Sequence, residues 1–144
     1  DLTAFKIYMS DVGLLRKHSH LATSAFAENN RLFTEFKGAL TENFVLQSLS
    51  RQFETAPRYW TETPYEVDFV VQLDNDIIPV ECKAGTNVRA TSLKKYSQQY
   101  QEQTPVMVRF SLMNLSFDGK VLNIPLFLAD RTVDLVRLVL NRNP

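Results

Sequence analysis

The feature that most constrains the fold is a pair of apolar segments separated by a short polar turn. Residues 66–73 (EVDFVVQL) carry an apolar side chain at almost every second position, which is typical of one face of a β-strand. Residues 74–76 (DND) are turn formers, and residues 77–84 (IIPVECKA) are again apolar and rich in branched side chains. The sequence therefore predicts a β-hairpin near the middle of the chain.

Three charged side chains interrupt this apolar hairpin. Alternation along the second strand puts Glu81 and Lys83 on the face opposite Val80. Alternation along the first strand puts Asp68 on the face opposite its core-facing neighbours. The core-facing side of this first strand is expected to carry Val67, Phe69, Val71 and Leu73. The hairpin is therefore expected to carry a small charged group on one surface.

The position of the turn decides how these charges pair. A turn at Asp74–Asn75 sets Asp68 opposite Glu81, whereas a turn at Asn75–Asp76 sets it opposite Lys83. Either register places all three charges on one surface, and a shift of one residue would bury them. Opposed Cβ atoms lie about 4.5–5.5 Å apart. Two carboxylates at that spacing can share a divalent ion, whose oxygen ligands lie at about 2.0–2.6 Å.

Such a group indicates metal-assisted hydrolysis. A bound Mg²⁺ or Mn²⁺ would offset the repulsion between Asp68 and Glu81, which Lys83 offsets only in part. The metal would position a water molecule, lower its pKa and neutralise the charge that develops on a phosphate. Lys83 would orient the nucleophile or stabilise that same charge.

Glu42 is the candidate fourth member of the group. Residues 35–53 (EFKGALTENFVLQSLSRQF) predict the longest helix of the chain. Its apolar stripe is expected to consist of Ala39, Leu46, Leu49 and Phe53. Glu42 lies on that stripe, and a carboxylate facing a core needs a partner. A metal shared with Asp68 and Glu81, or the ammonium group of Lys83, would supply one.

The remaining segments predict further strands and helices around the hairpin. Residues 5–9 (FKIYM) and 106–110 (VMVRF) read as short strands, and residues 89–102 and 132–140 read as helices. A polar turn leads into the apolar residues 121–129. This order predicts an α/β fold, with a mixed β-sheet flanked by helices, and one domain over residues 1–144.

Composition limits the partners that we expect. The formal net charge is zero, whereas proteins that grip nucleic acid alone usually carry a basic excess. Nucleic-acid binding would thus depend on local charges or on another domain. Cys82 is the single cysteine, so no internal disulfide can form, which favours the cytoplasm. No apolar run approaches the roughly 18 residues of a membrane span.

Asp68 followed by Glu81-Cys82-Lys83 resembles the PD-(D/E)xK pattern of restriction-endonuclease-like folds. Three longer strings, GALTENFVLQSL, YWTETPYEVDFVV and IIPVECKAG, are similar to the C-terminal domain of a group of bacterial and archaeal AAA-type ATPases. The resemblance extends from about Phe5 to Leu128. It implies a restriction-endonuclease-like mixed sheet, preceded by a P-loop ATPase domain. The absence of an initial methionine agrees with a C-terminal piece of such a protein.

Carried over residue by residue, the resemblance assigns the acidic helix position to Glu42 and the strand aspartate to Asp68. It assigns the E-x-K pair to Glu81 and Lys83. The chain departs from the wider pattern at Val67, where a proline often stands. The implied function is hydrolysis of nucleic-acid phosphodiesters, with DNA the first candidate and RNA the second, using Mg²⁺ or Mn²⁺.

Two alternatives remain open at this point. Asp68, Glu81 and Lys83 would also suit a solvated salt-bridge cluster on an exposed sheet face, with Glu42 reaching water at the helix boundary. Glu66 shares the face of Asp68 and is expected at its rim. The domain would then be a structural or interaction module that packs on the ATPase, forms a homo-oligomer or binds a partner without cleaving anything.

Overall fold

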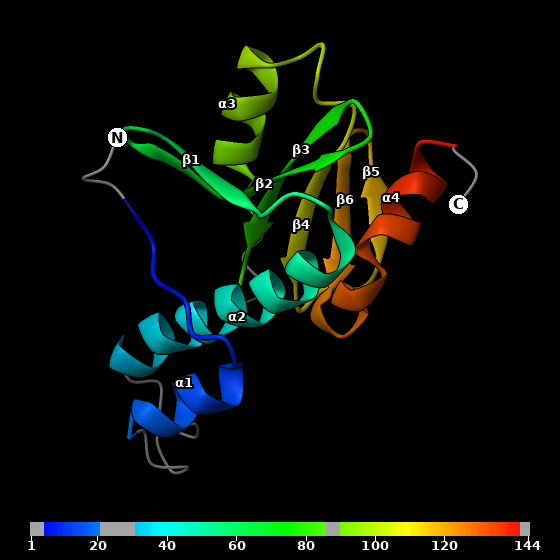
Figure 1. Ribbon diagram of the computed structural model, residues 1–144. Helices are drawn as coiled ribbons and strands as arrows, with labels where there is room; N and C mark the ends of the chain where they lie inside the picture. Colours follow the sequence, from blue (N-terminus) through cyan, green and yellow to red (C-terminus); the bar gives the residue numbers. More distant parts are fainter. Residues whose placement is uncertain (1–4, 21–30, 86–89, 142–144) are drawn as a thin grey trace.

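The computed structural model describes residues 5–20, 31–85 and 90–141, with side chains in α2 described from residue 36 onward (Figure 1). The elements in chain order are α1 (Val12–His18), α2 (Arg31–Gln52), β1 (Arg58–Glu62), β2 (Tyr65–Leu73), β3 (Asp76–Cys82), α3 (Thr91–Gln99), β4 (Met107–Ser111), β5 (Ser116–Asp118), β6 (Val121–Pro125), the 3-10 segment η2 (Leu126–Arg131) and α4 (Thr132–Val139).

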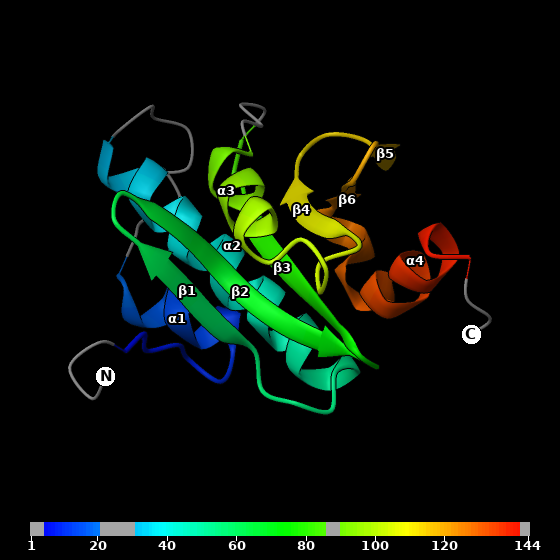
Figure 2. The same ribbon diagram turned by 90° about the horizontal axis from the view of Figure 1, so that it is seen from above.

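The six strands form one mixed sheet in the order β1-β2-β3-β4-β6-β5. Strands β1, β2 and β3 are antiparallel neighbours, β3, β4 and β6 run parallel, and β5 returns antiparallel to β6. The parallel step from β3 to β4 needs a crossover connection, which α3 provides. Figures 1 and 2 show α2 and α3 on opposite faces of this sheet. The predicted α/β class is therefore confirmed.

Two apolar cores hold the layers together. The larger core joins the sheet to α2, η2 and α4 and includes Val45, Leu49, Phe69, Phe110 and Val136. The smaller core joins the opposite face to α3 and is made by Val67, Ala90, Leu93, Tyr96 and Met107. Among the described residues, no helix is long and apolar enough to span a membrane.

The stripe predicted for α2 is correct at its C-terminal end. Leu49 and Phe53 are buried, but Leu46 is half-buried and Ala39 is exposed. The helix rises off the sheet toward its N-terminal end (Figure 1), so the apolar contact ends before Ala39. Glu42 therefore lies where α2 begins to leave the core, with 29% of its side chain exposed to solvent.

The strand predicted at residues 5–9 is not observed. This segment is extended but pairs with no strand, and it lies along α2 instead (Figure 1). The buried side chain of Asn43 takes the place of a partner strand. Its Oδ1 accepts a hydrogen bond from the Met9 backbone N–H at 2.9 Å, and its Nδ2 donates to the Met9 carbonyl at 3.1 Å. The backbone groups are therefore satisfied by a helix side chain.

The hairpin of β2 and β3 has the first of the two predicted registers. Leu73 pairs with Asp76, and the ladder runs to the pair of Phe69 and Val80. The turn is therefore at Asp74–Asn75, where Asp74 has a φ of 55° that aspartate tolerates well.

A β-bulge in β2 changes which side chains share a face. Arg58 of β1 pairs with Val70, but Trp60 pairs with Val67, so β2 carries one extra residue over this stretch. Val67 consequently packs in the α3 core beside Trp60, whereas Phe69 packs in the α2 core. The prediction that Val67 and Phe69 share a face is wrong for this reason.

Candidate functional site

Asp68 lies at the bulge, where β2 and β3 separate. The ladder between these strands ends at Phe69 and Val80, and the Asp68 carboxylate takes over the next hydrogen bond. Its Oδ2 accepts the backbone N–H of Cys82 at 2.7 Å. The Asp68 side chain is only 15% exposed. The bulge thus inserts a buried carboxylate between two diverging strands.

Glu42 of α2 approaches the same place from the other layer. Lys6 joins the two, since its Nζ lies 3.8 Å from Glu42 Oε2 and 3.9 Å from Asp68 Oδ1. The same ammonium contacts Oε1 of Glu66 most closely. Tyr8 donates a hydrogen bond from its hydroxyl to Glu42 Oε2 at 3.2 Å. The predicted approach of Glu42 to Asp68 therefore occurs around a lysine from the N-terminal segment.

Glu81 and Lys83 form a second pair. Lys83 Nζ lies 2.7 Å from Glu81 Oε1, and Glu81 is 4% exposed. Its other oxygen, Oε2, is buried without a hydrogen-bond partner. Alternation places Glu81 on the face of β3 opposite Val80, which packs in the α2 core. The contacts therefore divide the four predicted residues into Glu42 with Asp68 and Glu81 with Lys83.

The charge at Asp68 links these two pairs. Burial raises the pKa of Asp68 to about 6, and the nearby negative charges of Glu42 and Glu81 act in the same direction. The Cys82 N–H and the Lys6 ammonium lower this pKa, but they do not outweigh burial. Glu81 therefore acts on Asp68 across the β3 backbone.

The neighbouring groups keep their ordinary protonation states. Burial and the charge of Glu42 raise the pKa of Tyr8, so its hydroxyl remains a donor to that carboxylate. Burial and the charge of Asp68 raise the pKa of the Cys82 thiol. Cys82 also packs against the α2 core, so its thiol is a core group and no nucleophile. Burial lowers the pKa of Lys6, but the hydrogen bond to Glu66 and the negative charges of Glu42 and Asp68 outweigh burial, so the pKa is raised overall.

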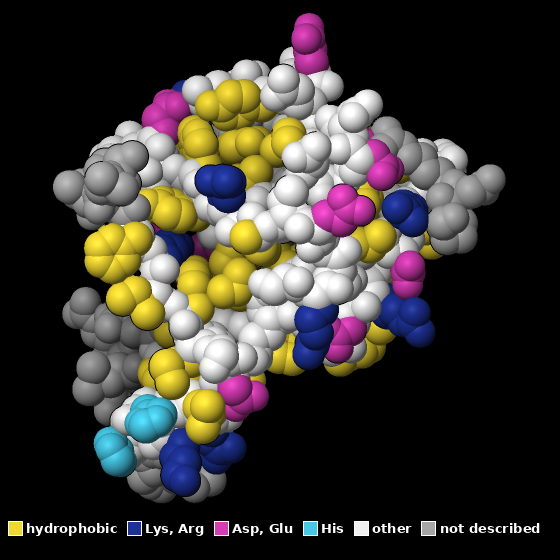
Figure 3. All heavy atoms as spheres, viewed as in Figure 1, with side chains coloured by type: hydrophobic (Ala, Val, Ile, Leu, Met, Phe, Trp, Pro, Cys, Tyr) yellow, Lys and Arg dark blue, Asp and Glu magenta, His cyan; other side chains and the backbone are white. Residues whose placement is uncertain are grey.

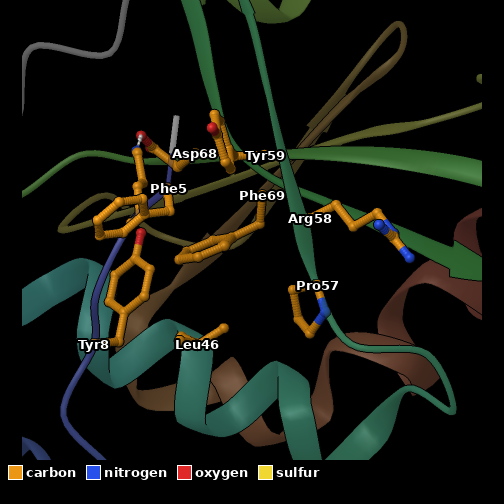
Figure 4. A pocket seen from close by; sticks show the side chains of 9 residues that line it. Phe5, Tyr8, Leu46, Pro57, Arg58, Tyr59, Asp68 and Phe69 are labelled. Atoms are coloured by element: carbon orange, nitrogen blue, oxygen red, sulfur yellow. Dashed lines mark ion pairs between the residues drawn. The ribbon is translucent and has the colours of Figure 1, made fainter. Parts of the chain in front are cut away.

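A hollow of about 480 Å³ opens beside Asp68 (Figure 4). It lies between the N-terminal segment, α2 and the start of β1. Figure 4 shows the rings of Tyr8 and Phe69 side by side at this hollow, with centroids 5.7 Å apart. Its lining residues are Phe5, Lys6, Tyr8, Leu46, Pro57, Arg58, Tyr59, Asp68 and Phe69. Asp68 thus lines a hollow whose other lining residues are mostly apolar or aromatic and include Lys6 and Arg58.

The donor chemistry of the site fits a hard divalent cation. Carboxylates from Glu42, Asp68 and Glu81 would present oxygen ligands alone, as Mg²⁺ and Mn²⁺ prefer. The buried Oε2 of Glu81, which lacks a hydrogen-bond partner, is the kind of group that a cation would satisfy. As the described side chains stand, however, no three acidic, histidine or cysteine groups converge as metal ligands. The cation found between Glu42 and Asp68 is the ammonium of Lys6.

Lys6 and Tyr8 are the site residues that the sequence interpretation missed. They lie at alternate positions of the segment FKIYM, which was expected to be a strand. Their common face was therefore a usable signal, although nothing in the sequence indicated that α2 and β2 would meet it. Glu66 was expected at the rim, and its half-exposed side chain holds Lys6 there.

We expect Asp68→Asn to stabilise the metal-free protein at high pH. The folded-state pKa of about 6 exceeds the ordinary 3.8, so folding favours the protonated carboxyl. Its contribution to stability is complete below about pH 4 and is lost as the pH rises through 6. At pH 8 the ionised group costs about 3 kcal/mol, from 1.36 kcal/mol per pKa unit. Asn should recover roughly 1–3 kcal/mol of this.

Urea unfolding in a chelator at pH 4, 6 and 8 measures this effect. The gain from Asp68→Asn should grow with pH and vanish near pH 4. Asp118→Asn changes an exposed aspartate in the same way and should show no such trend. A pH-independent gain, or a loss at pH 8, would show that burial of the charge is not what governs Asp68.

The fold and these contacts define an α/β domain with an acidic site where two central strands diverge. A family model for a domain of unknown function (DUF4143) matches residues 37–127, and the chain belongs to this family. The domain is often found with AAA ATPases. No curated protein and no solved structure matches the chain. The matched region contains Glu42, Asp68, Glu81 and Lys83, whereas Lys6 and Tyr8 precede it.

Proposed function

We propose that this domain is a metal-dependent nuclease of the PD-(D/E)xK type, which hydrolyses phosphodiester bonds in nucleic acid. The observation that carries the proposal is the buried carboxylate of Asp68 at the bulge. It shares the Lys6 ammonium with Glu42, and the negative charge of Glu81 helps to raise its pKa. Strongly perturbed carboxylates beside a hollow are frequent in catalytic sites. A salt-bridge cluster on an open sheet face would not be buried to this extent.

Each residue has a separate role in this proposal. Glu42, Asp68 and Glu81 would hold Mg²⁺ or Mn²⁺, which supplies Lewis acidity and a water of lowered pKa. Lys83 is held 2.7 Å from Glu81 and would place its ammonium beside the attacked phosphate. The Cys82 N–H fixes the Asp68 carboxylate, so that one oxygen is oriented before any ligand arrives.

The charge distribution indicates that the domain needs help to bind nucleic acid. Among the described residues visible in Figure 3, cationic and acidic side chains are interspersed, without a continuous basic strip on that face. The net charge of zero agrees with weak intrinsic affinity for long nucleic acid. We therefore propose that the chain is the C-terminal part of a longer cytoplasmic protein, whose AAA-type ATPase domain delivers the substrate. DNA is the first candidate substrate and RNA the second.

A second function is favoured by a specific observation. Lys6 lies between Glu42 and Asp68, and the predicted four residues form two pairs rather than one converged group. A domain that keeps its acidic site neutralised in this way would suit a structural or interaction module. It would pack on the ATPase domain or form a homo-oligomer without cleaving nucleic acid.

We expect Lys83→Met to lower Mn²⁺-dependent cleavage about 10²-fold or more, because the variant removes a charge aimed at the reacting phosphate. Initial rates on end-labelled DNA and RNA measure this. Lys94→Met removes an exposed lysine of α3 and should leave the rate unchanged. Thermal unfolding should show that both variants fold. Equal cleavage by wild type and Lys83→Met would favour the interaction module over the nuclease.

A further inference from the structure

The ammonium group of Lys6 contacts three carboxylates from two elements. Glu42 comes from α2, and Glu66 and Asp68 come from β2. Glu66 is the closest partner, and the other two lie at 3.8 and 3.9 Å. About a quarter of the Lys6 side chain reaches solvent, whereas the Glu66 side chain is about half exposed. Lys6 is therefore a cation held at the mouth of the acidic site.

The backbone that presents Lys6 is held by other contacts. Asn43 pairs with both backbone groups of Met9, and Gln47 Nε2 donates to the Ser10 carbonyl. The Tyr8 ring packs against Phe69. None of these contacts involves the Lys6 ammonium. The segment can therefore remain docked on α2 while the flexible Lys6 side chain changes partners.

A divalent ion and the Lys6 ammonium would need the same oxygens. A metal bound by Glu42 and Asp68 lies about 2.0–2.6 Å from their carboxylates. Lys6 Nζ lies 3.8 and 3.9 Å from oxygens of these same two carboxylates, so a metal bound to them would lie near a second cation, and the two would repel. Glu66 offers Lys6 a second partner at the rim, which the ammonium already touches. Such a site would have two states, with either a lysine or a metal between Glu42 and Asp68.

We infer that Lys6 is a built-in competitor of the metal, a tethered counter-ion that must move away from Glu42 and Asp68, keeping Glu66 as its only partner among the three, before these two residues can bind a divalent cation. This inference rests on the proposed metal site. In the metal-free state, Lys6 neutralises carboxylates that would otherwise repel one another. The apparent metal affinity is then lowered by the small fraction of molecules in which Lys6 has left. The N-terminal segment therefore sets the metal concentration at which the site fills.

Lys6→Met tests the competition directly, because methionine keeps much of the apolar stem and removes the charge. The probe is Mn²⁺ alone, without nucleic acid, and free Mn²⁺ is followed by electron paramagnetic resonance. We expect the variant to bind Mn²⁺ with a Kd lower than wild type by about ten-fold or more, as for a site that Lys6 blocks at least nine-tenths of the time. Lys95→Met is the matched control, since Lys95 pairs with Glu62 at 2.9 Å outside this cluster.

Thermal unfolding provides a second test that does not depend on the Mn²⁺ titration. Without metal, Lys6→Met should melt below wild type because its carboxylates lack their counter-ion. Added Mn²⁺ should raise the melting temperature of Lys6→Met more than that of wild type or Lys95→Met. Introducing Asp68→Asn into the Lys6→Met variant should abolish this difference, because it removes a shared ligand.

The outcomes separate this inference from the proposed function. If wild type binds Mn²⁺ through Asp68 and Lys6→Met binds it equally or more weakly, the competition is refuted and the metal site stands. If neither protein binds Mn²⁺, the metal site itself is refuted, together with the competition. Binding by Lys6→Met that is tighter than wild type and sensitive to Asp68→Asn supports both.

Discussion

Asp68→Asn is expected to reduce Mn²⁺-dependent cleavage of nucleic acid about 10³-fold or more. Metal-ion catalysis supplies several kcal/mol of transition-state stabilisation, and each 1.36 kcal/mol is a factor of ten in rate. Asp68 is the residue on which the site depends most, because it shares a cation with Glu42 and is fixed by the Cys82 N–H. Asn keeps the shape and can accept that hydrogen bond, but it lacks the charge.

The same substitution should therefore have opposite effects on stability and on activity. A more stable protein at pH 8 that no longer cleaves would show that Asp68 is retained for binding a cation rather than for folding. Asp118→Asn should change neither property. Full cleavage activity in Asp68→Asn would place the chemistry elsewhere in the preparation or in the chain.

Leu49→Ala is expected to lower the free energy of unfolding by about 2–5 kcal/mol, as for other fully buried leucines. Leu49 is 0% exposed and lies in the core that joins α2 to the sheet. The cavity left by Leu49→Ala would weaken the packing of α2 on the sheet, and this packing holds Glu42 near Asp68. We therefore expect weaker Mn²⁺ binding in addition to the lower stability.

Urea unfolding monitored by circular dichroism measures the loss. Leu138→Ala is the matched control, because Leu138 lies on α4 with 69% of its surface exposed. Leu138→Ala should lower the free energy of unfolding by less than about 0.5 kcal/mol. A similar cost at both positions would mean that the contact of α2 with the sheet does not determine stability.

The hairpin shows how far sequence patterns determine this fold. Alternation from Phe69 to Leu73 and the polar residues 74–76 limited the hairpin to two registers, and the one with its turn at Asp74–Asn75 is observed. The bulge was not predictable from β2, because its residues alternate regularly in sequence. It arises from pairing with β1, where the register shifts between Arg58 and Trp60. Tertiary pairing thus altered the face of Val67 without a local signal.

The N-terminal segment shows the opposite case, in which a local pattern was misleading. The alternating residues 5–9 predicted a short strand, yet the segment pairs with no strand among the described residues, and Phe5 and Ile7 are 71% and 82% exposed. Lys6 and Tyr8 point inward instead, because the carboxylates of Glu42 and Asp68 need a cation and a donor. The contacts of Lys6 and Tyr8 with carboxylates distant in sequence therefore determine the orientation of this segment more than its alternating apolar residues do.

Glu42, Asp68 and Glu81 are proposed to bind a catalytic divalent cation. An anomalous difference map from crystals grown with Mn²⁺ tests it most directly. We expect a peak within about 2.6 Å of Asp68 and of Glu42 or Glu81 oxygens, with the Lys6 ammonium moved away from Glu42 and Asp68 and still paired with Glu66. No peak at Asp68, at a Mn²⁺ concentration that supports cleavage, would contradict the claim.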